Sequence, residues 1–110
     1  MVTELNGCWF GSSRAPDGST LVSISGELDS VNAVELARLL GNIAAEGDVT
    51  LDLEQVRFID SRGLGALVHA ARTARDAGHS LRVVSLSPRV SKVFEIAGVA
   101  EVLPFDQSAG

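Results

Sequence analysis

Residues 58–68 read Phe58-Ile59-Asp60-Ser61-Arg62-Gly63-Leu64-Gly65-Ala66-Leu67-Val68, and they join an apolar, strand-like run to the start of a helix. Before them, residues 49–53 alternate between apolar and polar side chains with the period of two that is typical of a strand. After the corner, apolar residues recur at helical spacing, at Leu64, Leu67, Val68, Ala71 and Ala74. Asp60 and Ser61 are therefore predicted to lie where a strand turns into a helix.

Both residues have an ordinary structural use at such a corner. The first turn of a helix leaves backbone N–H groups without partners and carries partial positive charge, so a short side chain with an oxygen atom stabilises it as an N-cap. Asp and Ser are preferred N-caps in helices generally, so Asp60 and Ser61 alone do not indicate a functional site.

Two glycines fall within the first two turns of this predicted helix. In a helix interior, Gly63 and Gly65 each cost about 0.5–1 kcal/mol relative to Ala, so some other interaction should compensate. One explanation is close packing of the helix on the sheet. The other is a docking surface around Ser61 that a second molecule approaches closely, and the sequence leaves both open.

The segment from Asp60 to Gly65, together with the earlier Gly26-Glu27-Leu28-Asp29, resembles the signature of the STAS family of bacterial anti-sigma factor antagonists, also called anti-anti-sigma factors. The similarity covers roughly residues 8–105. One position differs, because many members have Ser or Thr where this chain has Arg62.

The resemblance implies a function regulated by phosphorylation. In the family, the serine after the aspartate is phosphorylated by an anti-sigma factor that is also a serine kinase of the GHKL type, and the matching residue is Ser61. Unphosphorylated, the chain would bind this kinase and so release a sigma factor. Phosphorylation on Ser61 would abolish binding, and a PP2C-type phosphatase would restore it.

The expected partner-binding surface surrounds Ser61. The family motif contributes Asp29, Asp60, Ser61, Arg62, Gly63 and Leu64. Residues three or four apart share a helix face, so we extend this surface along the exposed side of the following helix to Arg72.

A second function also remains open. The fold resembles STAS modules that act as regulatory or structural subunits of membrane transport and stress-signalling assemblies, where binding is constitutive. Co-purification of a transporter ATPase or a scaffold, in place of a GHKL-type kinase, would favour this alternative.

The whole sequence narrows the class of protein. Its length of 110 residues predicts one domain, residues 1–110, with a core at about 8–105. Its composition, with 45% hydrophobic and 21% charged residues, is typical of a globular protein. A net charge of -5 without clustered Lys or Arg argues against nucleic acid as a partner. The single Cys8 fits a reducing compartment, and the sequence has no signal peptide and no apolar run long enough for direct membrane insertion, so we expect a cytoplasmic protein.

The alternation of strand and helix patterns predicts an α/β fold, with a four- to five-stranded mixed β-sheet packed against α-helices. We expect residues 1–7 to be a loose start and Asp29 or Ser30 to cap the first helix. Strands are predicted at 8–10, 21–25, 49–53, 81–86 and 102–103, with a short link from 53 to 58–59, and helices at 31–46, 61–77 and 88–97.

Catalysis is not expected. Ser61 could be a nucleophile only with a base in reach, and His69 lies about 12 Å further along the same helix. A nucleophile elbow is also missing, because Ile59 occupies the position of its first glycine. Gly63 and Gly65 do not belong to a dinucleotide-binding motif, because Val68 occupies the position of its third glycine, so we predict no cofactor. His69 and His79 have no other metal-binding residues at suitable spacing, so we predict no metal and surface positions for both histidines.

Overall fold

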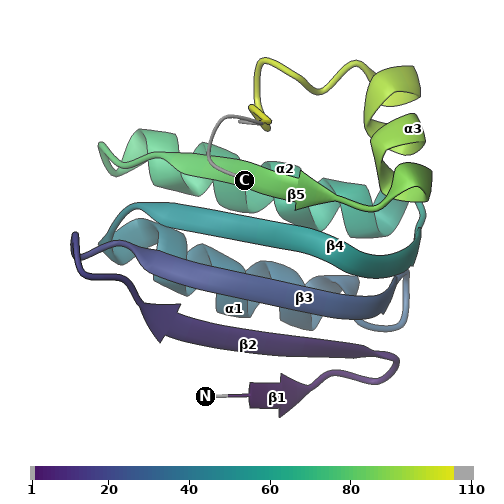
Figure 1. Ribbon diagram of the computed structural model, residues 1–110, viewed down its shortest axis with the longest axis horizontal. Coiled ribbons are helices and arrows are strands. Elements are labelled where there is room, and N and C mark those ends of the chain that lie inside the picture. The colour runs from purple at the N-terminus through teal and green to yellow at the C-terminus, as the bar shows by residue number, and fades with distance from the viewer. Residues whose placement is uncertain (1, 106–110) are drawn as a thin grey trace.

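The computed structural model describes residues 2–105 as a five-stranded sheet with the strand order β1-β2-β3-β4-β5 and three helices, which confirms the predicted α/β class. Figure 1 shows α1 and α2 side by side on one face of the sheet, with α3 at one end. The elements are β1 Val2–Glu4, β2 Cys8–Arg14, β3 Thr20–Leu28, α1 Ala33–Glu46, β4 Val49–Ile59, α2 Ser61–Asp76, β5 Leu81–Leu86 and α3 Pro88–Ala97.

The sheet is mixed. β1, β2 and β3 pair antiparallel, whereas β3, β4 and β5 pair parallel. Parallel neighbours need a crossover connection, and here α1 and α2 supply the two crossovers. Both therefore lie over the sheet and bury their apolar stripes against it. The largest fully buried side chains of the resulting core include Phe10, Ile24, Leu28, Leu36, Leu40, Leu51, Leu53, Leu67 and Leu103.

The start of the chain is more ordered than predicted. Val2 pairs with Gly11 and Glu4 with Trp9, so residues 2–4 form the edge strand β1 in place of a loose start. Leu5 is buried, which means that the core begins before residue 8. Residues 2–4 are too few to show a clear alternation, so the sequence alone did not reveal this strand.

β4 is one continuous strand, so the predicted link after residue 53 is wrong. Its pairing with β3 shifts register twice, between Ser23 and Ser25 and again between Gly26 and Glu27. Such β-bulges place two residues opposite one and bend the strand without ending it. They also break the period of two, which is why the sequence pattern suggested a link.

The third helix begins as predicted. Ser87 is its N-cap and accepts a hydrogen bond from the Val90 N–H, and Gly98 ends it in the left-handed conformation. The strand predicted at 102–103 is wrong, because those residues form a turn. The pairing comes later, where Phe105 makes an isolated parallel bridge to Val83.

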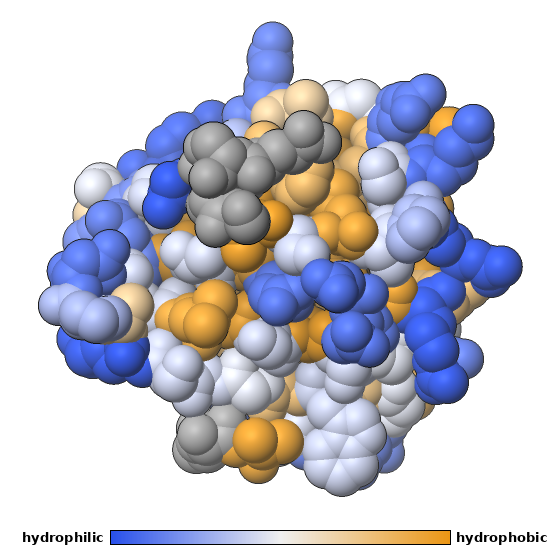
Figure 2. Space-filling view, viewed as in Figure 1, coloured by the Kyte–Doolittle hydropathy of each residue, from blue (hydrophilic) through white to orange (hydrophobic). Residues whose placement is uncertain are grey.

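The opposite face of the sheet carries no helix in Figure 1. Figure 2 shows apolar side chains on this face in several patches separated by polar ones. None of the helices within residues 2–105 has the length and apolar character needed to cross a bilayer.

Candidate functional site

The candidate site lies where β3 and β4 end. These strands are parallel neighbours, so their carboxyl ends meet, with Leu28 beside Ile59. The Asp60 N–H donates to the Leu28 carbonyl at 3.1 Å, which ties the two junctions together. The loop from β3 into α1 and the first turn of α2 therefore share one end of the molecule, the right-hand end in Figure 1.

Asp60 is the N-cap of α2. Its Oδ1 accepts hydrogen bonds from the Arg62 and Gly63 N–H groups, both at 2.9 Å. Ser61 is the first residue of the helix, and its side chain is exposed. Capping is thus supplied by the aspartate, and within residues 2–105 no hydrogen bond to the Ser61 hydroxyl is found.

The two glycines of the motif have different surroundings. A Cβ at Gly63 would lie 2.7 Å from two Leu28 carbons and closer still to the Leu28 carbonyl oxygen. At Gly65 a Cβ would meet nothing within 4 Å. Gly63 therefore permits close packing of α2 on the end of β3, whereas Gly65 leaves open space at the surface.

Asp29 shapes the loop before α1. Its carboxylate accepts from the Val31 N–H at 3.0 Å, and its carbonyl accepts from the Asn32 and Ala33 N–H groups. The expectation that Asp29 or Ser30 caps α1 is wrong, because the N-cap is Asn32, whose side chain makes no capping bond. Asp29 instead closes a turn that precedes the helix.

Asn32 is a buried polar residue that the sequence analysis missed. Its side-chain amide donates to the Glu27 carbonyl at 2.8 Å and the Asn6 carbonyl at 3.1 Å, and its Oδ1 accepts from the Asp29 N–H. The amide thus joins the loop after β1 to the loop that carries Asp29. Its partners are all backbone groups, and the Asn6 carbonyl lies 26 residues away in sequence, so no sequence pattern marked it.

An apolar groove runs between α1 and α2 next to Ser61. Its volume is about 240 Å³, and it is lined by Ala33, Val34, Ala37, Arg62, Gly65, Ala66 and His69. Val34, which lines the groove, is 82% exposed, and Val31, three residues earlier in the chain, is 69% exposed. The sequence offered one signal for Val34, since it is apolar yet lies outside the buried stripe of α1.

The remaining predicted residues are placed as follows. Arg62 is exposed and lines the groove. Leu64 is buried, with 9% of its surface exposed, so its side chain belongs to the core. Arg72 is exposed, but it lies ten residues beyond Arg62, about 15 Å along the helix, and outside the groove.

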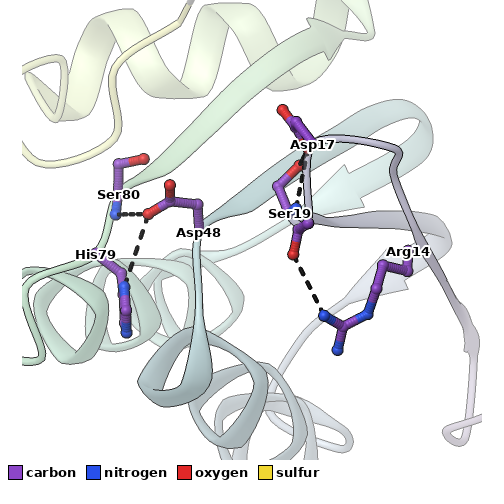
Figure 3. A network of polar contacts seen from close by, with 7 residues as sticks. Arg14, Asp17, Ser19, Asp48, His79 and Ser80 are labelled. Atoms are coloured by element: carbon purple, nitrogen blue, oxygen red, sulfur yellow. Dashed lines mark hydrogen bonds and ion pairs between the residues drawn. The ribbon is translucent and has the colours of Figure 1, made fainter.

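A separate polar network lies at the opposite end of the molecule, where β4 and β5 begin (Figure 3). Asp48 accepts from the Ser80 N–H at 2.9 Å, and the His79 ring lies 3.8 Å away from its carboxylate. His79 is half-buried beside this carboxylate, whereas a solvated surface position was expected. Within residues 2–105, no three His, Cys, Asp or Glu side chains are grouped so that they could hold a metal ion.

Comparison with known proteins identifies the family. The family model described as Mlab, STAS domain matches residues 12–104. This chain belongs to the STAS domain family. Among its relatives, the anti-sigma-B factor antagonist of Bacillus subtilis (strain 168) is 34% identical over 83 residues, which are 74% of this chain and 76% of that protein. The protein of the same name from Staphylococcus aureus (strain NCTC 8325 / PS 47) is 31% identical over 84 residues, 74% of this chain and 78% of that protein.

Solved structures share the fold of this STAS domain. An anti-sigma factor antagonist from Mycobacterium paratuberculosis has a TM-score of 0.77 at 27% identity, covering 96% of this chain and 90% of that one. The anti-sigma factor antagonist SpoIIAA in its unphosphorylated form has a TM-score of 0.72 at 19% identity, covering 89% and 88%. At that identity, the second similarity is evidence for the fold alone.

Proposed function

We propose that this STAS domain is an anti-sigma factor antagonist that is switched by phosphorylation of Ser61. Both relatives described above are at least 30% identical and are named anti-sigma-B factor antagonists, which supports the proposed role as an anti-sigma factor antagonist. The proposal that phosphorylation of Ser61 is the switch depends on one observation. The Ser61 side chain is exposed at the start of α2, and because Asp60 is the cap, phosphorylation leaves the cap in place.

The unphosphorylated protein binds an anti-sigma factor with GHKL-type serine kinase activity, in the cytoplasm, and so releases a sigma factor. The partner covers the exposed Val31 and Val34 side chains and the groove between α1 and α2. Burial of apolar surface supplies the affinity, at roughly 25 cal/mol per Å² before the costs of association are subtracted. Docking there also brings the kinase active site close to Ser61.

Phosphorylation then separates the two proteins through charge. The kinase transfers the γ-phosphoryl group of ATP to the Ser61 oxygen, the hydroxyl proton is lost, and ADP leaves. The phosphate carries about -1.5 to -2 charges at neutral pH and lies next to the Asp60 carboxylate. The start of α2 stabilises this anion within the protein, whereas burying it against an apolar partner surface is costly. A PP2C-type phosphatase hydrolyses the phosphoester and restores binding.

The test uses the GHKL-type kinases encoded by the source organism, each purified and mixed with this protein and ATP. We expect one of them to bind and to phosphorylate the wild type on Ser61, whereas Ser61→Ala binds but is not phosphorylated. Ser91→Ala, an exposed serine on α3, is the matched control and should behave as wild type. Phosphorylation of Ser61→Ala to the same extent as the wild type would overturn the assignment. So would co-purification of a transporter ATPase or a scaffold, if none of the kinases binds.

The groove has its own test. Val34→Asp places a charge on the exposed side of α1 beside the groove, and we expect it to weaken kinase binding while the melting temperature stays near that of the wild type. Ala45→Asp introduces the same charge at an exposed position near the other end of the helix and should bind normally. Equal affinities for the two variants would remove the groove from the interface.

A further inference from the structure

The second bulge of β4 changes which side chains face solvent near the site. Val56 pairs with Gly26 and Phe58 pairs with Glu27, so Arg57 has no counterpart on β3. In a regular strand, neighbouring side chains point to opposite faces. Here both Arg57 and Phe58 are exposed between buried residues, and Phe58 keeps 41% of its surface exposed. Bulges near functional sites commonly re-aim side chains in this way.

The start of α3 places a second arginine beside the first. The Ser87 hydroxyl donates to the Val56 carbonyl at 2.7 Å, which fixes the N-terminus of α3 against the bulge. Arg89 in the first turn then borders the same two hollows as Arg57, one of about 490 Å³ and one of about 400 Å³. Only these two arginines line both hollows, so they form a ridge between them.

Arg57 and Arg89 form no ion pair within residues 2–105, although the carboxylates of Glu27, Asp29 and Glu54 also border the two hollows. The first turn of α3 holds no acidic residue. A cation at a helix N-terminus is unfavourable, because the helix dipole is positive at that end. The ridge is therefore a surface that an anionic group from another molecule would stabilise.

We propose that Arg57, Phe58 and Arg89 form a second contact region for the anti-sigma partner, which places a carboxylate side chain on the arginine ridge and covers the Phe58 ring. This inference rests on the proposed function and extends its interface from α1 and α2 to β4 and α3. Asp29 connects the two regions, since it follows β3 at the site and also lines the smaller hollow.

The chemistry of the three side chains fits this role. A guanidinium group binds a carboxylate with two parallel hydrogen bonds, which gives directional recognition as well as charge. Arginine and aromatic residues are also enriched in protein interfaces and among the residues that contribute most to affinity. The contact region thus adds charge recognition to the apolar groove.

The test is a titration of the kinase that phosphorylates Ser61 with the wild type, Arg57→Glu, Arg89→Glu and Arg14→Glu. Arg14 ends β2 at the opposite end of the sheet, so its variant has the same charge change away from both contact regions. We expect about tenfold or greater loss of affinity for the first two variants, a loss that shrinks at high salt, and less than about twofold for Arg14→Glu. Arg57→Gln and Arg89→Gln replace any Glu variant that fails to melt like the wild type.

Wild-type affinity for the Arg57 and Arg89 variants would overturn the second contact region, and so would an equal loss for all three variants, which indicates an effect of net charge. Phosphorylation of Ser61 by the same kinase would still stand in either case. If no GHKL-type kinase binds the wild type, the proposed function fails and the contact region fails with it.

Discussion

At the residue scale, two neighbouring residues at the corner between β4 and α2 have different roles. Asp60 bonds two backbone N–H groups of the first turn, and Ser61 projects into solvent. A serine that also capped the helix would lose that role when modified. The division leaves the Ser61 side chain exposed and outside the capping hydrogen bonds.

This division predicts unequal effects of two alanine substitutions. Asp60→Ala should lower the free energy of unfolding by about 0.5–2 kcal/mol, the usual cost of losing an N-cap. Ser61→Ala should change it by less than about 0.5 kcal/mol, as for an ordinary surface position. Urea unfolding followed by circular dichroism measures both. A larger loss for Ser61→Ala than for Asp60→Ala would contradict the assignment of the cap.

Asn32 gives a second prediction at this scale. Asn32→Ala removes the partner of two backbone carbonyls and one N–H at the Asp29 loop, so we expect a loss of about 1–3 kcal/mol in unfolding free energy. Asn42→Ala, at an exposed position in α1, is the control and should stay within about 0.5 kcal/mol of the wild type. Similar losses for the two variants would mean that the Asn32 amide does not stabilise the loop.

At the scale of elements, the way α2 sits on the sheet depends on the absence of a side chain at Gly63. Gly63→Ala should destabilise the protein by about 1–3 kcal/mol, because the added methyl group overlaps Leu28. Gly65→Ala should stabilise it by about 0.5–1 kcal/mol, because it adds helix propensity in open space. Thermal or urea unfolding of the two variants checks both signs. Equal effects would show that Gly63 does not determine the packing.

The elements that the sequence predicted best are those with local signals. Ser87 with Pro88 marked the start of α3, and the apolar spacing after Ser61 marked α2, because capping and amphipathic patterns depend on nearby residues. The strand β1 and the bulges of β4 depend on pairing with strands elsewhere in the chain. No window of sequence contains that information, so these features were missed.

The candidate site shows the same contrast between features with local sequence signals and features that depend on tertiary structure. The positions of Asp60 and Ser61 followed from a short motif, and the structure places them at the expected corner. The groove beside Val34 and the ridge of Arg57 and Arg89 depend on α1, β4 and α3 meeting at one end of the sheet. Such surfaces arise from tertiary structure, and a sequence pattern identifies their residues only as exposed.

At the scale of the whole molecule, the stability of the fold depends on pH through the Cys8 thiol. Burial, together with the smaller effects of the negative charges of Asp29 and Glu4, raises the pKa of the Cys8 thiol to about 11. Because this pKa is higher in the folded than in the unfolded protein, Cys8 contributes stability below about pH 9 that is lost as the pH rises toward 11. We expect a Cys8→Ala variant to lose less stability than the wild type between pH 8 and pH 10.5. Parallel pH dependences for the two proteins in urea unfolding would contradict this.

The proposed switch lies at one end of the sheet, and it is tested most directly by measuring kinase affinity before and after phosphorylation of Ser61. Isothermal titration of the kinase with the unmodified and the stoichiometrically phosphorylated protein gives the two dissociation constants. We predict that the phosphorylated form binds at least about 100-fold more weakly, near 2.7 kcal/mol, while its circular dichroism spectrum is unchanged. Equal affinity of the two forms would contradict the switch.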